Sequence, residues 1–364
     1  MQPASGSNSN AFTVYRSPAR YAAWPANYGM WAWGDEIVLC FTVGYPSTSG
    51  SEAGFHTRDK TRQFTTMQAR SLDGGVSWDV VEAPLSGAAS LSAHEHQTPE
   101  VLSRLPDLEF QSTDDLNFFA TDFVVMCGRT DLTEGATSWF YTSTDRCKSW
   151  TGPHKLPMFG ELGIAARTDW MIEGPRSATI LLTSTNYDGQ EGRVFAARTY
   201  NGGASFSRLG WIDVSPPGFQ IMPASVKTSL GHIVTAVRTR GKTRRENSID
   251  VYSSQDGAES WSYLGKAVTD TGNGGNPPTL NMLEDGRLVM FYGSRVEPFG
   301  IYMTTSPDLG KSWNEPEPIR LGGGGHDLGY PRAVVRSDGS LVVGYYFNES
   351  EDGERYIEAS IVRA

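Results

Sequence analysis

Short hydrophobic runs typical of β-strands recur along the chain in groups of three, and a turn-like segment follows each group. The clearest runs in the C-terminal part are residues 220–226, 232–238, 248–254, 287–293, 301–306, 330–336, 340–347 and 355–361. The last group reaches the C-terminus without a fourth run. The run at 12–16 could supply that missing strand, which would close the chain into a ring.

The turn-like segments share the pattern Ser/Thr-x-Asp-x-Gly-x-x-Trp. They are SLDGGVSW (71–78), STDRCKSW (143–150), TYNGGASF (199–206), SQDGAESW (254–261) and SPDLGKSW (306–313), with variants at some positions. Asp or Asn folds its side chain onto nearby backbone N–H groups, and Gly allows a positive φ. Each segment therefore predicts a hairpin turn between the third and fourth strands of a repeating unit.

The repeat predicts the fold class. Successive turn segments start 72, 56, 55 and 52 residues apart, and a period near 50 residues is typical of a propeller blade. Six units of four strands give an all-β, six-bladed β-propeller with Asp-box turns. We expect one propeller domain over residues 11–364 and a disordered tail at 1–10. The alternatives are a β-sandwich or a solenoid.

Composition agrees with many short strands joined by turns. The 364 residues include 40 Gly and 20 Pro, and 11% are aromatic, which argues against a disordered chain and against a helical bundle. The net charge of −10 argues against a general binder of nucleic acid or anionic membranes. The three Cys imply no disulfide framework.

No targeting or membrane segment is expected from the sequence. No stretch approaches the roughly 18–20 consecutive apolar residues of a membrane span. The N-terminus MQPASGSNSN lacks the basic and apolar regions of a signal peptide. The compartment stays open between the cytoplasm and secretion with the signal removed.

One face of the predicted propeller collects candidate functional residues. The start of the first strand of each blade, the end of the second strand and the loop after it share a face. The candidates are Asn27, Asp59, His96, Arg129, Arg167, Asp169, Gln220, Arg238, Asn276, Arg295, His326, Tyr330 and Arg332. Several Arg on a rigid frame suit bidentate recognition of a carboxylate, so the predicted partner is a glycan with a carboxylate group.

The histidines offer other chemistry. His94 and His96 share a strand face, but a third and a fourth ligand are not evident, so no metal and no cofactor are predicted. His96 could serve as a general acid or base, and His326 could contact the substrate.

The turn repeats, with Arg238 and Arg295 before the fourth and fifth of them, resemble the sialidase (neuraminidase) superfamily of Asp-box or BNR-repeat propellers. The resemblance covers nearly the whole chain and looks like a divergent branch. In that family three Arg bind the sialic acid carboxylate, a Tyr paired with a Glu is the nucleophile, and an Asp is the acid/base. The resemblance implies that Arg238 and Arg295 bind the carboxylate, Tyr330 is the nucleophile and Asp59 is the acid.

The expected function is therefore an exo-acting glycosidase that removes a terminal acidic sugar, either a sialic acid or a related ulosonic or uronic acid. The Glu partner of the nucleophile should fall near residues 220–222, where the sequence reads QIM. That departure keeps open a polysaccharide lyase on uronate-containing glycans, with Tyr330 or His96 as the base. A non-catalytic glycan-binding propeller is the third reading.

Overall fold

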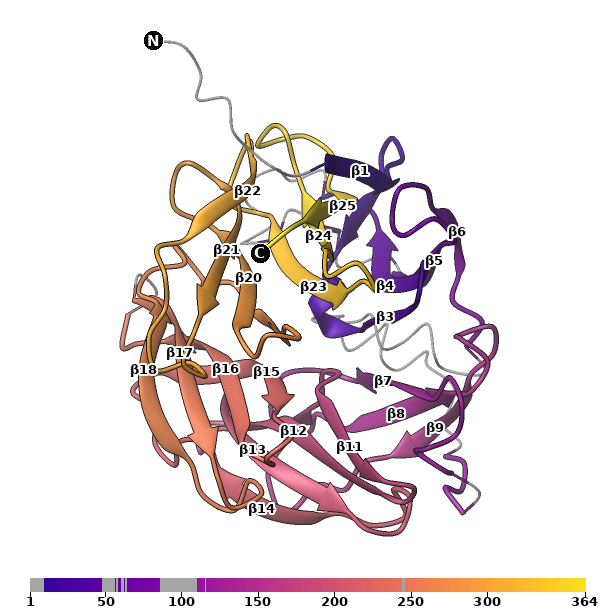
Figure 1. Cartoon of the computed structure of the whole chain (residues 1–364), viewed down its shortest axis with the longest axis vertical. Coiled ribbons are helices and arrows are strands. Elements are labelled where there is room, and N and C mark those ends of the chain that lie inside the picture. Colours follow the sequence, from indigo (N-terminus) through magenta and orange to yellow (C-terminus); the bar gives the residue numbers. More distant parts are fainter. Residues whose placement is uncertain are drawn as a thin grey trace.

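The chain folds into a ring of six β-sheets, seen down its axis in Figure 1. The computed structural model describes residues 10–47, 56, 58–59, 62, 64–85, 110–114, 116–243 and 246–364. Within these ranges the helical structure is a single 3-10 turn, η1 (Pro25–Asn27). The predicted all-β, six-bladed propeller is confirmed.

The first three blades run around the ring in chain order, with antiparallel neighbours. The first holds β2 (Tyr21–Ala23), β3 (Met30–Trp33), β4 (Glu36–Gly44), β5 (Thr65–Ser71) and β6 (Asp79–Glu82). The second holds β7 (Val124–Arg129), β8 (Ser138–Ser143) and β9 (Thr151–Lys155) in the described part of the chain. The third holds β10 (Ile164–Ala165), β11 (Trp170–Gly174), β12 (Ser177–Thr185), β13 (Glu191–Thr199) and β14 (Ser207–Trp211).

The fourth and fifth blades are regular four-stranded sheets. The fourth holds β15 (Phe219–Lys227), β16 (Ile233–Arg240), β17 (Asn247–Ser254) and β18 (Ser262–Val268). The fifth holds β19 (Thr279–Met282), β20 (Leu288–Ser294), β21 (Gly300–Ser306) and β22 (Glu317–Leu321). The first strand of each lies toward the axis and the last at the rim (Figure 1).

The sixth blade joins the two ends of the chain. It holds β23 (Gly329–Val335), β24 (Leu341–Phe347) and β25 (Tyr356–Val362), and β1 (Asn10–Tyr15) is its outermost strand. Phe12 lies opposite Ala359 in the antiparallel register. The N-terminal strand therefore closes the ring, as the sequence predicts.

The turns between third and fourth strands are held by their own side chains. In the first, the Asp73 carboxylate accepts hydrogen bonds from the backbone N–H groups of Val76 and Ser77 at 3.1 and 2.9 Å. The Ser71 hydroxyl accepts from Gly75 N–H at 2.8 Å, and the indole N–H of Trp78 donates to the Gly75 carbonyl. These bonds satisfy the backbone polar groups within the turn, so the turns serve the structure of the rim. The candidate functional residues are expected on the opposite face.

The core lies between the blades. All of β24, Leu341–Phe347, is buried because neighbouring blades cover both faces of this strand. Val343 and Tyr345 pack with Val289 and Phe291 of the fifth blade. Burial of apolar surface stabilises such contacts by about 25 cal/mol per Å². Strands covered on both sides give a frame rigid enough to hold side chains around the axis.

Among the described residues, no helix has the length and apolar character needed to cross a membrane.

Removing β1 should destabilise the whole ring. Deletion of residues 1–15 leaves the edge of β25 unpaired, and an unpaired edge strand favours aggregation. We expect the midpoint of thermal unfolding to fall by several degrees and the protein to aggregate on heating. Deletion of residues 1–9 alone keeps β1 and is the control. Equal unfolding midpoints for the two truncations would contradict the closure role.

Candidate functional site

Tyr330 lies at the start of β23, where the strand is irregular. The pairing of β23 with β24 shifts register between Gly329 and Arg332, and Tyr330 has a φ of +51°. A bulky residue rarely adopts this left-handed conformation, and such strain persists where the surrounding structure imposes it. The bulge turns the Tyr330 ring toward the axis, where it is 4% exposed.

Asn276 fixes this conformation. Its side-chain oxygen accepts a hydrogen bond from Tyr330 N–H at 2.9 Å, and its amide nitrogen donates to the Leu328 carbonyl at 2.8 Å. A Cβ at Gly329 would clash with the Asn276 amide, so this approach requires glycine there. Asn276 is fully buried, and its amide serves to position Tyr330.

Two arginines from the ends of neighbouring second strands reach Tyr330. Nη1 of Arg238, on β16, donates to the Tyr330 hydroxyl at 3.0 Å, and its Nη2 donates to the Gly274 carbonyl. The Arg295 guanidinium lies 5.7 Å from the centre of the Tyr330 ring. Arg295 is anchored by the Gly275 carbonyl at 2.6 Å. The structure thus brings together the two arginines and the tyrosine that the sequence places on one face.

Arg129 and Arg167 extend this group toward the second and third blades. Arg167 donates to the Asn27 side chain at 3.1 Å and lies 3.5 Å from the Glu191 carboxylate. Arg129 donates to the Ala166 carbonyl at 3.1 Å. We call Arg129, Arg167, Arg238 and Arg295 the arginine cluster. Four guanidinium groups from four blades therefore surround one phenol.

The arginine cluster changes the acidity of the phenol. Burial alone would raise the pKa of Tyr330, but Arg238, Arg295 and Arg167 outweigh it and lower the pKa below its ordinary value of 10. Burial, together with the charge of Arg167, lowers the pKa of Arg129 to about 9. The cations repel one another, and an anion among them relieves that repulsion. This environment favours a phenolate and a bound carboxylate.

Arg332 and Asp169 are structural neighbours of the cluster. Arg332 donates to the Ala26 carbonyl at 2.9 Å, which ties the sixth blade to the first. Asp169 accepts from the Ser225 N–H and hydroxyl groups at 3.0 and 2.7 Å, and burial raises its pKa. Both side chains therefore link neighbouring blades.

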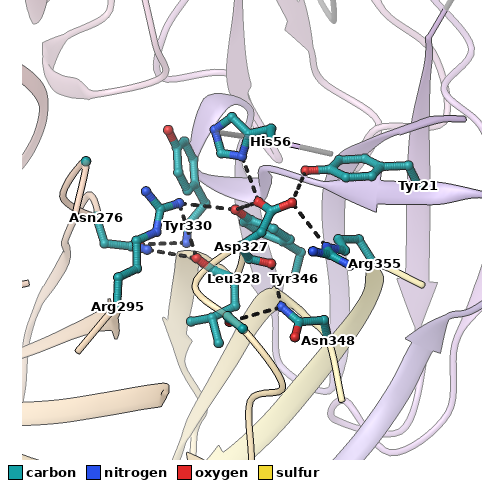
Figure 2. A network of polar contacts seen from close by, with 12 residues as sticks. Tyr21, His56, Asn276, Arg295, Asp327, Leu328, Tyr330, Tyr346, Asn348 and Arg355 are labelled. Carbon is teal, nitrogen blue, oxygen red and sulfur yellow. Dashed lines mark hydrogen bonds and ion pairs between the residues drawn. The ribbon is translucent and has the colours of Figure 1, made fainter. Parts of the chain in front are cut away.

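Beside Tyr330 lies a second group of polar side chains around Asp327, which Figure 2 shows from close by. Asp327 is fully buried. Its carboxylate accepts from the hydroxyls of Tyr21 and Tyr346, both at 2.8 Å, and from Nε of Arg355 at 3.1 Å. It also contacts Nδ1 of His56 at 2.7 Å. We call these five residues the Asp327 network.

The network joins the arginine cluster to the first blade. Arg295 of the cluster donates to the hydroxyl of Tyr346 in the network at 3.2 Å, so one hydrogen bond joins the two groups (Figure 2). Burial opposes ionisation of Asp327, but His56, Arg355 and Arg295 outweigh it and hold the pKa of this carboxyl well below its usual range. Asp327 is therefore ionised at neutral pH.

The indole of Trp24 packs beside His56. The centre of the Trp24 ring lies 5.3 Å from the imidazole, and the Arg58 guanidinium covers the same indole at 4.6 Å. Trp24 has a φ of +59° at the start of η1, so a second strained residue faces the site.

The remaining residues named from the sequence lie outside the arginine cluster, and one lies outside the described residues. Gln220 donates to the Tyr252 hydroxyl at 2.6 Å and lines a separate cleft of about 820 Å³ between the third and fourth blades. Asp59 lies in the loop that carries Arg58, where its N–H donates to the Tyr45 carbonyl at 2.8 Å. His326 is half-buried next to Asp327. His96 lies outside the described residues.

Sequence reasoning missed most of the Asp327 network. His56 and Asp327 are far apart in the chain and belong to no motif, and Tyr21 and Arg355 look like ordinary strand residues. Tyr346 falls within the aromatic run at the end of β24, a position that the face argument already favours. Glu191, which lies near Arg167, is the first residue of β13, and its place directly after the loop that follows a second strand was the available signal.

No three His, Cys, Asp or Glu side chains among the described residues are grouped so that they could hold a metal ion.

Comparisons with known proteins bear on the fold. No family model matches the chain, and no curated protein matches it in sequence. A protein of unknown function from Dyadobacter fermentans is similar over 96% of this chain and 97% of its own, with a TM-score of 0.70 and 19% identity.

Two further solved structures are glycoside-acting proteins by name. An α-L-arabinanase from Penicillium chrysogenum, in complex with arabinobiose, is similar over 97% of both chains, with a TM-score of 0.60 and 14% identity. The NanB sialidase from Streptococcus pneumoniae is similar over 97% of this chain and 71% of its own, with a TM-score of 0.62 and 12% identity. At these identities the likeness shows a shared fold.

Proposed function

We propose that this protein is an exo-acting glycosidase that removes a terminal acidic sugar from a glycan, either a sialic acid or a related ulosonic or uronic acid. The observation that carries the proposal is the Tyr330 hydroxyl, which is buried, is bonded by Arg238 at 3.0 Å and has its pKa lowered by three guanidinium groups. Perturbed acidity of this kind at the axis of a propeller is typical of a reactive group.

The arginine cluster is suited to the carboxylate of the sugar. Arg238 and Arg295 approach Tyr330 from two blades, and each is fixed by backbone carbonyls, so their guanidinium planes are preorganised. Planar guanidinium groups bind carboxylates through paired, charge-assisted hydrogen bonds. A neutral sugar such as arabinose offers no charge to this cluster, so we favour an acidic substrate over an arabinan.

Tyr330 is proposed to act on the anomeric carbon. A phenol with a lowered pKa loses its proton more easily and can attack as a nucleophile or stabilise an oxocarbenium-like state. Asp59 is the proposed donor of a proton to the leaving oxygen, from its loop in the first blade. These roles follow the sialidase pattern, which the five turns with Asp or Asn at the third position and the NanB sialidase likeness support at the level of fold. We propose that the chain represents a divergent sialidase-like branch.

A polysaccharide lyase acting on uronates is the second candidate, and one observation favours it. No described carboxylate hydrogen-bonds the Tyr330 hydroxyl, whose partner is Arg238. In a lyase the arginine cluster neutralises the uronate carboxylate, and an ionised Tyr330 removes the proton next to it. The glycosidic bond to the neighbouring carbon then breaks, a carbon–carbon double bond forms, and the leaving oxygen takes up the proton that Tyr330 removed.

A substrate panel tests both candidates. Fluorogenic sialosides, uronosides and arabinofuranosides are incubated with the protein beside acidic polysaccharides, and products are read by mass spectrometry and ultraviolet absorbance. The glycosidase predicts release of a free acidic sugar with the mass of one added water. The lyase predicts an unsaturated product without added water. Binding without any product would contradict both and would favour a glycan-binding propeller.

A further inference from the structure

His56 and Asp327 form a histidine–carboxylate pair at the edge of Tyr330 (Figure 2). The Nδ1–Oδ1 distance is 2.7 Å, and the His56 and Tyr330 rings meet edge to face with centres 6.2 Å apart. We propose that His56 is a further catalytic residue that carries the proton exchanged with Tyr330, and that Asp327 positions it. The inference rests on the glycoside-cleaving function proposed above and deepens it.

The pair fixes which nitrogen of His56 reacts. An ionised Asp327 can only accept a hydrogen bond, so Nδ1 of the neutral imidazole carries the proton and donates it. Nε2 is then the basic nitrogen. A carboxylate that orients an imidazole in this way also stabilises the imidazolium that forms when Nε2 takes up a proton.

Asp327 is held so that it cannot rotate away. The hydroxyls of Tyr21 and Tyr346 and the Arg355 guanidinium occupy its carboxylate from three further directions. Asn348 also donates to the Asp327 main-chain carbonyl at 2.8 Å. These partners fix the Asp327 carboxylate in one orientation, as is needed to position a reactive imidazole. An ion pair that served stability alone would require only Arg355.

Exposure distinguishes the two members of the pair. The Asp327 side chain is 1% exposed and the His56 side chain is 17% exposed, so the imidazole forms the outer end of the network. The second face of His56 meets Trp24 at 5.3 Å between ring centres. The carboxylate thus lies behind the imidazole, and the imidazole lies beside the phenol.

Burial, reinforced by two nearby arginines, keeps His56 neutral at physiological pH. Burial is the largest effect and lowers its pKa to about 4, with Arg295 and Arg58 acting in the same direction and Asp327 opposing them. Tyr330, Tyr21 and Tyr346 are the other titratable groups of this region. A neutral imidazole accepts protons, so His56 starts the reaction as a base.

With His56 as the proton acceptor of Tyr330, every proton in the glycosidase reaction is accounted for. The Tyr330 O–H bond breaks, its proton passes to Nε2 of His56, and the Tyr330 oxygen bonds to the anomeric carbon. The glycosidic carbon–oxygen bond breaks, and the leaving oxygen receives one proton from the imidazolium or from Asp59. In the second half, a water O–H bond breaks, and its proton passes to the group that protonated the leaving oxygen. The water oxygen bonds to the anomeric carbon as the bond from that carbon to the Tyr330 oxygen breaks, and the His56 imidazolium returns a proton to Tyr330.

Variants of His56 test the proposal on the substrate that the panel identifies. His56→Ala should lower kcat by about 10²–10⁴-fold, the usual contribution of a positioned acid or base, and added imidazole should restore part of it. The matched control is His232→Ala in the turn between β15 and β16, which should leave kcat unchanged with or without imidazole. Imidazole rescue separates proton transfer from packing.

Asp327→Asn tests the positioning role through the pH profile. The carboxylate raises the pKa of His56, so its loss should move the acidic limb of kcat/KM to lower pH. It should also reduce kcat more than it changes KM. Should His56→Ala fail to fold, His56→Gln keeps a hydrogen-bond donor toward Asp327 without a titrating group, and its kcat decides.

The outcomes separate the inference from the function on which it rests. Wild-type kcat in a folded His56 variant, or no rescue by imidazole and no shift of the acidic limb in Asp327→Asn, would overturn the role of the pair while the glycosidase stands. A wild-type protein that cleaves nothing on the panel would overturn the proposed function, and the pair's role with it.

Discussion

Replacing Tyr330 with phenylalanine should abolish turnover while the propeller stays folded. The change removes one hydroxyl, and with it the group that Arg238 bonds at 3.0 Å. Because the phenol is the proposed reacting group, we expect kcat to fall by at least about 10³-fold, within the range for loss of a group that acts in the transition state. Steady-state kinetics on the panel substrate measures the loss.

The matched control for Tyr330→Phe is Tyr345→Phe in the same blade. Tyr345 is also buried, and its hydroxyl bonds Glu358 at 2.9 Å and Ser360 at 2.6 Å, away from the arginine cluster. Each variant should lose about 1 kcal/mol of stability from the missing hydrogen bond, but Tyr345→Phe should keep its activity. Comparable kcat values for the two variants would remove Tyr330 from the mechanism.

Asp327→Ala should cause the largest loss of stability of any single change in the site. Arg355 and Asp327 are 3% and 1% exposed, so removal of the carboxylate leaves a guanidinium buried without its counter-charge. Breaking such a pair from one side costs about 3–5 kcal/mol. Denaturant unfolding at neutral pH measures the difference from wild type. The exposed pair of Asp285 with Arg287 offers the control Asp285→Ala, which should change stability little.

The stability difference should depend on pH in a defined direction. The pKa of Asp327 is depressed in the folded state, so its contribution is full above the unfolded value of about 4 and is lost as pH falls below it. Wild type should therefore lose stability in acid faster than Asp327→Ala, and the gap between the two should narrow. A gap that stays constant through this window would show that Asp327 acts by packing alone.

The ring could be predicted from the sequence because its signals are local and repeated. Asp73 and Gly75 mark a turn through bonds within a few residues, and the same pattern recurs at near-regular spacing. Strand alternation then places the ends of the second strands and the starts of the first strands on one face. This argument brought Arg238, Arg295 and Tyr330 together without any knowledge of the contacts between them.

Strand alternation does not predict which face a side chain takes where the backbone departs from a regular strand. Gln220 and Met222 would share a face in a regular strand, but Met222 has a φ of +55° and the pairing of β15 shifts register there. Gln220 turns to Tyr252, while the Met222 sulfur lies 3.8 Å from Arg238. Such bulges depend on packing between blades, which no single segment encodes.

The Asp327 network could not be predicted for a different reason. Each of its members comes from a loop or strand end without a motif, and only ring closure brings them together. Asp327 follows the glycine-rich segment 322–325, which carries no motif for a buried carboxylate. Its burial is set by the first blade, about three hundred residues away in the chain.

The joining of the two chain ends in the sixth blade has a consequence for how the protein loses activity. Ala22 N–H donates to the Arg355 carbonyl at 2.9 Å across the seam between the first and last blades, and Tyr21 and His56 reach Asp327 across the same seam. Parting of this seam would pull the reacting groups away from one another while the remaining blades stay stacked. Heat inactivation should therefore occur at a lower temperature than global unfolding of the ring.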